Sequence, residues 1–107
     1  MTIRTAVSAA LSLALASSLA LAQKKGDAAK GKEVFEQCAV CHSVTGEKKM
    51  GPTLKGLYQK EKLANGQKVS DASITAMINK GKGNMPAFAD VLTADEKTDL
   101  LAYLKTI

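Results

Sequence analysis

Both cysteines of this chain and its only histidine fall within five consecutive positions, as Cys38, Cys41 and His42 in the stretch CAVCHS. No other feature of the 107 residues constrains the fold as strongly. Three reactive side chains are presented from a stretch little longer than one helical turn. Such a cluster occurs in redox-active dithiols, in zinc sites and in sites of covalent haem attachment, and each of these predicts different surroundings.

The sequence around the cysteines disfavours a dithiol and a zinc site. A thioredoxin-like dithiol has its first thiol at a helix N-terminus beside a βαβ pattern, whereas Cys38 falls near the end of a predicted helix, where the dipole disfavours a thiolate. A structural zinc ion needs four protein ligands. Beyond Cys38, Cys41 and His42 the chain has no other Cys or His, and His42 adjoins Cys41 too closely to wrap a tetrahedral ion.

Covalent haem attachment accounts for all three residues. Both thiols add to the vinyl groups of the haem, and the imidazole that follows binds the iron from one face. The vinyl groups and the iron belong to one rigid planar molecule, so their anchors must come from a short stretch of chain. The sequence therefore predicts one haem c attached through Cys38 and Cys41, with His42 as an iron ligand.

The N-terminus has the layout of a secretory signal peptide. Arg4 is followed by no charged residue until Lys24, and the apolar part ends in the small-residue triplet Ala20-Leu21-Ala22. A membrane anchor is the alternative, because the uncharged run approaches the roughly 20 residues that span a bilayer. Ala, Ser and Thr dominate this run, so we expect cleavage of residues 1–22. Residues 23–107 would then form a single exported domain in a bacterial periplasm, with no membrane insertion.

The composition of the expected mature domain indicates a thin core and a basic surface. It has no Trp, two Phe and two Tyr, and a domain of this size usually needs a staple such as a cofactor. Its formal charge is +4, since Arg4 is the only charge in the leader, and all of its cations are lysines. Acidic residues interleave with the lysines, which disfavours nucleic-acid binding and favours docking to acidic proteins.

Apolar periodicity predicts an all-α fold of three to four helices wrapped around the haem. The expected N-caps are Asp27, Ser70 or Asp71, and Thr93, which forms a capping box with Glu96. The predicted helices span residues 27–42, 53–62, 70–83 and 93–107, the second being short and interrupted by glycine. Most of residues 43–69 lack firm regular structure, which predicts loops draped over a buried ligand.

Iron bound to His42 has a second axial position, for which methionine is the remaining soft ligand. Met50 lies eight residues after His42 and is expected to stay on the same side of the haem. Met77 lies on the apolar stripe of a predicted helix, where methionine usually fills a core. Met85, in the loop GKGNMP, is far enough along the chain to reach the opposite face. We therefore expect Met85 to be the second ligand.

The chain resembles the class I c-type cytochromes, which are small soluble haem proteins. The stretches GKEVFEQCAVCH, GPTLKGL, MPAF and LLAYL occur in the order found in that family and cover essentially residues 26–107. The resemblance implies a small cytochrome c-like fold. It also implies thioether bonds at Cys38 and Cys41, with His42 as the proximal ligand and Met85 as the distal ligand.

Further contacts follow from the same resemblance. Pro52 is expected to offer its carbonyl to the other ring nitrogen of His42 and so fix the orientation of the imidazole. Gly31 and Phe35 on the first helix are expected to cross Leu101 and Tyr103 on the last. Residues 57–69 match no motif of the family, so the partners of the haem propionates stay open, with Tyr58 and nearby lysines as candidates.

His/Met ligation predicts a one-electron carrier rather than an enzyme, because a filled sixth position leaves no open site for substrate. We expect a monomer that shuttles electrons between redox proteins with acidic docking surfaces. Lysines near the haem-contacting segments are expected to form a cationic rim: Lys48, Lys49, Lys55, Lys80 and Lys82. The alternatives are a haem subunit of a larger membrane oxidoreductase, or a gas- or peroxide-binding protein with a labile sixth ligand.

Overall fold

A computed structural model describes residues 25–107, and the expected signal peptide at residues 1–22 lies outside this range. The described part of the chain is helical, as the sequence predicts. Its elements in chain order are α1 (Ala28–Phe35), the 3-10 helix η2 (Leu57–Gln59), α2 (Asp71–Lys80) and α3 (Ala94–Leu104). None of these helices is both long and apolar enough to cross a bilayer, a finding that covers residues 25–107.

Each α-helix begins at an N-cap that the sequence predicts. The carboxylate of Asp27 accepts hydrogen bonds from the first-turn amides of α1. Ser70 rather than Asp71 caps α2, and Thr93 forms the expected capping box with Glu96 at the start of α3. These side chains satisfy amides that have no partner within their own helix.

All four predicted helices are shorter in the structure, the first two by the most. Residues 53–62 form only the single turn η2, because Gly56 just before it adopts a left-handed conformation with φ 66° that a continuous right-handed helix does not allow. The first helix ends at Phe35 and continues to His42 as a series of tight turns. In these turns the amides of Cys41 and His42 both donate to the carbonyl of Cys38, at 3.1 and 2.9 Å.

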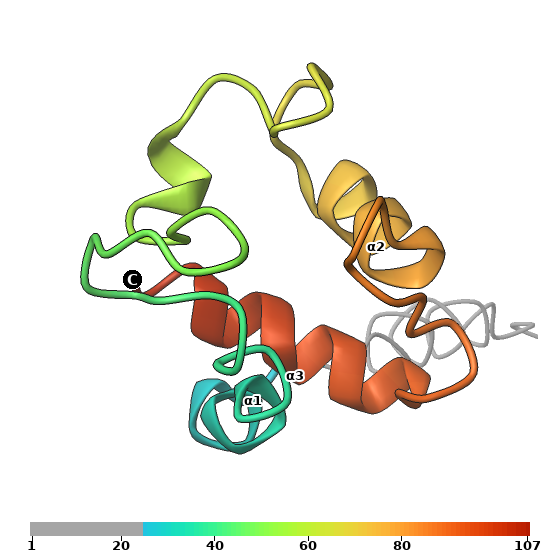
Figure 1. Ribbon diagram of the computed structural model, residues 1–107. Helices are drawn as coiled ribbons and strands as arrows, with labels where there is room; N and C mark the ends of the chain where they lie inside the picture. The colour runs from blue at the N-terminus through green and yellow to red at the C-terminus, as the bar shows by residue number, and fades with distance from the viewer. Residues whose placement is uncertain (1–24) are drawn as a thin grey trace, which may run out of the picture.

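Helices α1 and α3 cross at close range (Figure 1). A Cβ atom built on Gly31 would overlap the carbonyl oxygen of Asp99 and would lie 2.8 Å from the Cβ of Tyr103. Next to this point the rings of Phe35 and Tyr103 pack with centroids 5.4 Å apart. The predicted crossing is therefore confirmed for Gly31, Phe35 and Tyr103, and glycine is required because any side chain would push the helices apart.

The elements form a ring around a central space (Figure 1). Helices α1 and α3 lie on one side, η2 and α2 lie at the two flanks, and residues 60–70 close the ring opposite α3. The buried apolar side chains are Phe35, Leu57, Ile74, Ile78, Leu92, Leu100 and Leu104. They come from α1, η2, α2 and α3 and from the segment before α3, and none comes from residues 60–70.

Candidate cofactor site

The centre of the ring is a cavity of about 770 Å³. This volume lies within the roughly 300–1,000 Å³ typical of sites for small molecules and cofactors. Six of the seven buried apolar side chains line the cavity, Leu92 being the exception. The apolar residues of this domain therefore pack against one another and at the same time form much of the wall of the cavity.

The cavity brings together all the side chains that the sequence predicts to hold haem. Cys38, Cys41, His42, Pro52 and Met85 all line it. Both cysteines are free thiols. Burial raises the pKa of the Cys38 thiol above its ordinary value, which is the opposite of what an activated redox dithiol requires. The surroundings of Cys38 therefore disfavour the dithiol interpretation.

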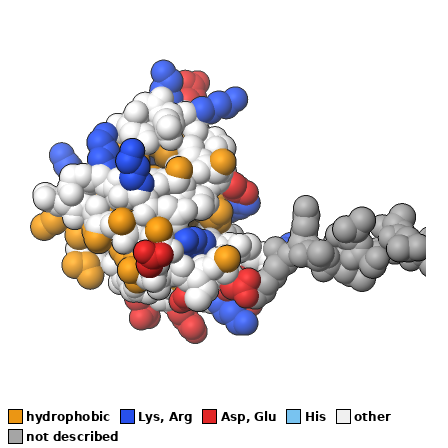
Figure 2. All heavy atoms as spheres, turned by 90° about the vertical axis from the view of Figure 1, so that its right-hand side faces the viewer, with side chains coloured by type: hydrophobic (Ala, Val, Ile, Leu, Met, Phe, Trp, Pro, Cys, Tyr) orange, Lys and Arg blue, Asp and Glu red, His pale blue; other side chains and the backbone are white. Residues whose placement is uncertain are grey.

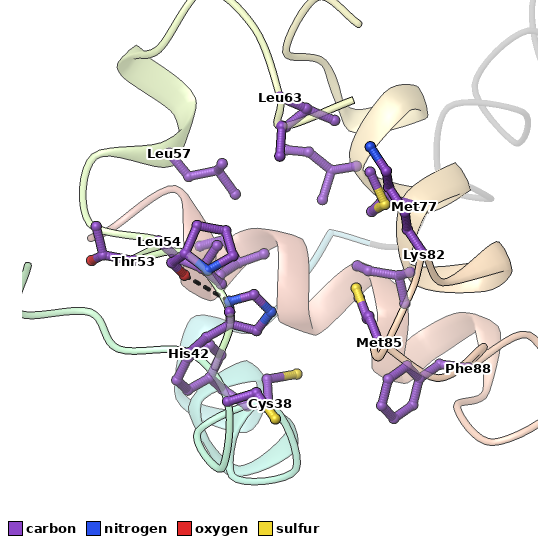
Figure 3. Close-up of a pocket in the computed structure, with 18 of the residues that line it drawn as sticks. Cys38, His42, Thr53, Leu54, Leu57, Leu63, Met77, Lys82, Met85 and Phe88 are labelled. Atoms are coloured by element: carbon purple, nitrogen blue, oxygen red, sulfur yellow. Dashed lines mark hydrogen bonds between the residues drawn. The ribbon is translucent and has the colours of Figure 1, made fainter. Parts of the chain in front are cut away.

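One hydrogen bond fixes the imidazole of His42. Its Nδ1 lies 2.7 Å from the carbonyl oxygen of Pro52, which is the contact expected from the sequence. A carbonyl can only accept, so Nδ1 carries the proton and donates it. The other ring nitrogen, Nε2, is then left with a free lone pair, and it faces the cavity (Figure 3).

The loop that carries Pro52 is packed directly against the histidine ring. The amide of Gly51 donates to the carbonyl of Cys41 at 2.8 Å, and the amide of Leu54 donates to the carbonyl of Ser43 at 2.8 Å. A Cβ atom on Gly51 would lie 2.6 Å from Cε1 of His42. The backbone of this loop therefore approaches the ring as closely as it can, and the two amide bonds keep it there.

Met85 faces His42 from the opposite wall of the cavity (Figure 3). It closes a tight turn in which the amides and carbonyls of Lys82 and Met85 bond to each other, at 3.1 and 3.0 Å. The turn starts at Gly81, whose φ of 70° is left-handed and where a Cβ would lie 2.8 Å from the carbonyl of Pro86. Beyond the turn, the amide of Phe88 donates to the carbonyl of Ile78 at 2.9 Å and ties the loop to α2.

The two other candidate methionines occupy different surroundings. Met50 is 73% exposed, and its sulfur lies 4.0 Å from the Sγ of Cys41 on the histidine side of the cavity. Met77 is half-buried on α2 and lines the cavity, where its sulfur lies on the same wall as Met85 (Figure 3). The sequence predicts Met77 to fill a core, and the structure places it in the cavity wall.

Tyr58, a candidate partner for the haem propionates, is not among the side chains that line the cavity. Its hydroxyl donates to Asp71 at 2.7 Å, and Lys105 pairs with the same carboxylate at 3.3 Å. Burial and the hydrogen bond to Asp71 raise the pKa of Tyr58, and the same bond lowers the pKa of Asp71. Tyr58 thus joins η2 to α2 and to the end of α3, whereas the nearby lysines Lys60 and Lys62 do line the cavity.

The residues that line the cavity fit the covalent haem that the sequence predicts. Two free thiols lie at one end, a nitrogen lone pair and a thioether face each other across the middle, and the walls are mostly apolar. A flat, largely apolar group with a metal at its centre matches this set of donors. Cys38 and Cys41 would hold its edge, and His42 and Met85, which face each other across the cavity, would hold its metal.

Comparison with known proteins supports the same group. The family whose sequence model matches is described as cytochrome c oxidase, cbb3-type, subunit III, and the match covers residues 26–104. A cytochrome c6 from Rippkaea orientalis is 42% identical over 80 residues, which are 74% of this chain and 69% of that protein. A cytochrome c2 from Blastochloris viridis is 35% identical over 109 residues, 85% of each chain. The crystal structure of cytochrome c6 from the diatom Phaeodactylum tricornutum superposes with a TM-score of 0.60 at 32% identity, over 76% of this chain and 93% of that one.

Proposed function

The chain belongs to the small class I c-type cytochromes and carries haem c on Cys38 and Cys41, and we propose that it is an exported one-electron carrier whose iron is bound by His42 and Met85. The observation that carries this proposal is the position of Nε2 of His42 opposite Met85 across an apolar cavity. When bound, the haem supplies an iron centre that gains and loses one electron. The residues of the chain would set the potential of this centre and the surface by which it docks.

The two proposed ligands set the redox behaviour. The imidazole of His42 is held by Pro52 and the turn of Met85 is closed by its own hydrogen bonds, so neither ligand has to move when the charge of the site changes. A thioether favours the reduced iron more than a second imidazole does. The apolar walls exclude water and act in the same direction. We therefore expect a moderately positive potential.

The distribution of charge supports docking to an acidic partner. Residues 43–86, which contain most of the cavity loops, have eight lysines and three acidic residues, a net charge of +5. The rest of the described chain, residues 25–42 and 87–107, has five lysines and seven acidic residues, a net charge of −2. In Figure 2 most lysines of the visible face lie in its upper part and most acidic side chains lie below. Such polarity steers a carrier towards a negative surface and orients it there.

An apolar patch lies at the mouth of the cavity, near several of these lysines in the sequence. Val40 and Met50 are 79% and 73% exposed and both line the cavity. The expected rim lysines, including Lys48 and Lys49, are exposed as well. An apolar centre with a charged rim is the usual anatomy of a transient protein interface. We place the route of the electron here, beside Cys41.

The carrier would act as a monomer in the periplasm, since a signal peptide is expected at residues 1–22.

One observation favours a second candidate function. The family match is described as a subunit of an oxidase, so a permanent place in a membrane oxidoreductase is the alternative. Purification from the exported fraction distinguishes the two, because a free carrier is recovered alone and a subunit is recovered with its complex.

Carbon monoxide tests the ligand assignment. The visible spectrum of the reduced wild-type protein should barely change with the gas, because both axial positions are filled. Met85→Ala should bind carbon monoxide at once. Met77→Ala is the matched control, since it removes the other thioether of the same wall, and it should behave like the wild type. Rapid binding by the wild type, or by Met77→Ala in place of Met85→Ala, would refute the assignment.

A further inference from the structure

The charged side chains that line the cavity are all basic. They are Lys60, Lys62 and Lys82, and no Asp or Glu of the described residues lines the cavity. The rim of the cavity therefore carries positive charge, which favours a ligand whose outer edge is anionic.

These lysines have few partners of their own. The ammonium of Lys60 makes one long hydrogen bond, 3.4 Å to the carbonyl of Thr53. Lys62 and Lys82 form no ion pair with any residue in the range 25–107. All three side chains are exposed, which places their charges at the mouth of the cavity. They are therefore free to bind a carboxylate that reaches the mouth from inside.

The ends of the cavity can be assigned from the covalent chemistry of haem. The ring carries its two vinyl groups and its two propionates on roughly opposite edges, and the vinyl edge is held by Cys38 and Cys41. In Figure 3, Cys38 lies at one end of the cavity and Leu63 lies at the other. The propionates therefore point towards the segment that contains Leu63.

Lys62 adjoins Leu63 at that end, where the antiparallel bridge between Lys62 and Lys68 holds the segment as a narrow loop. Lys60 precedes this loop, and its ammonium lies beside the carbonyl of Thr53. On the facing wall the side chain of Lys82 extends from the turn of Met85 towards the Leu63 end (Figure 3). The two walls thus bring their cations to the edge of the haem that carries the negatively charged propionates.

We propose that the two haem propionates are bound between Lys60 and Lys62 on one wall of the cavity and Lys82 on the other. The proposal rests on the haem orientation of the proposed function, with His42 and Met85 on opposite faces. Lys82, which the sequence predicts to belong to the docking rim, would then bind the cofactor instead of a partner protein. It also predicts that these lysines offset the negative charge of the propionates near the iron.

The test uses the holoprotein with Lys60→Gln, Lys62→Gln and Lys82→Gln. Lys55→Gln is the control, because it removes the same charge from an exposed position of the same region that does not line the cavity. We expect the proton NMR signals of the propionate methylenes to shift in the three cavity variants and to stay in place in the control. The reduction potential should fall further in the cavity variants than in Lys55→Gln.

Each outcome decides one point. The proposal is overturned if the propionate signals and the potentials of all three variants equal those of Lys55→Gln. If only Lys82→Gln, or only the variants of Lys60 and Lys62, give the values of the control, the contact with that wall is overturned. The methyl signal of an iron-bound methionine, recorded in the same spectra of the reduced protein, reports on the proposed function. If that signal is absent from the wild type, the ligation by Met85 fails. If it is present and the propionates do not respond, only the assignment of the lysines fails.

Discussion

The carbonyl of Pro52 accepts a 2.7 Å hydrogen bond from Nδ1 of His42, and this contact decides which nitrogen of the only histidine faces the cavity. The bond depends on a loop whose neighbouring residue, Gly51, lies against the ring. A metal-ligating imidazole needs such a partner to fix both its tautomer and its orientation.

Gly51→Ala should weaken the ligation by His42. The new Cβ would lie 2.6 Å from Cε1 of the ring, so the ring or the loop must move and the bond to Pro52 must lengthen. Overpacking of this kind costs about 1–3 kcal/mol of unfolding free energy. Thermal unfolding of the holoprotein should show a lower Tm, and redox titration should show a changed potential. Wild-type values for both would show that the loop yields without disturbing the histidine.

Gly31→Ala should destabilise the contact between α1 and α3. A methyl group there would overlap the carbonyl oxygen of Asp99, which is backbone and cannot rotate away. We expect a loss of about 1–3 kcal/mol or more in the free energy of unfolding, measured by denaturant titration of the holoprotein. Lys32→Ala, at an exposed position of the same helix, is the control and should stay within about 0.5 kcal/mol of the wild type. Equal midpoints for the two variants would contradict the close crossing.

The chain without haem should not fold cooperatively. Six of its seven buried apolar side chains line the cavity, so without the cofactor each of them loses part of its packing. A domain of this size has little other apolar area to bury. Calorimetry of Cys38→Ala/Cys41→Ala, purified without haem, should show no unfolding peak. A sharp transition in that material would mean that the ring of helices holds itself together.

Electron transfer to an acidic redox partner should slow as ionic strength rises. The attraction between the positive part of this chain, residues 43–86, and a negative surface is screened within about 8 Å at physiological salt. Stopped-flow rates should fall between low and moderate salt, and Lys48→Gln/Lys49→Gln should flatten this dependence. Lys30→Gln/Lys32→Gln, an equal loss of charge on α1, should leave it unchanged. Rates that do not respond to salt would exclude the lysine rim as a docking surface.

The parts of the fold that the sequence predicts correctly are those set by local chemistry. Asp27, Ser70 and Thr93 cap their helices through amides only two or three residues away, and such signals can be read directly from a sequence. The cluster of Cys38, Cys41 and His42 is local in the same way, because its spacing matches one rigid ligand. The helix expected over residues 53–62 fails at Gly56, because a glycine can be read from the sequence but its left-handed φ of 66° cannot.

The misplaced residues depend on contacts between distant segments. Tyr58 does bind a carboxylate, but it is the carboxylate of Asp71, thirteen residues further along the chain. Lys105, from the C-terminal end of α3, completes this group and lies over the ring of Tyr58. Lys60 and Lys62 are among the nearby lysines that the sequence offers for the propionates, but they carry no motif, and only the closure of the ring of helices brings them to the mouth of the cavity.

Leu100 is 1% exposed and also lines the cavity, so one face of the same side chain supports the protein and the other borders the cofactor. A change at such a position alters the melting temperature and the midpoint potential in a single step. Natural variation in this wall must therefore trade one property against the other. Substitution of the exposed charged residues at the mouth of the cavity changes the potential without disturbing this packing.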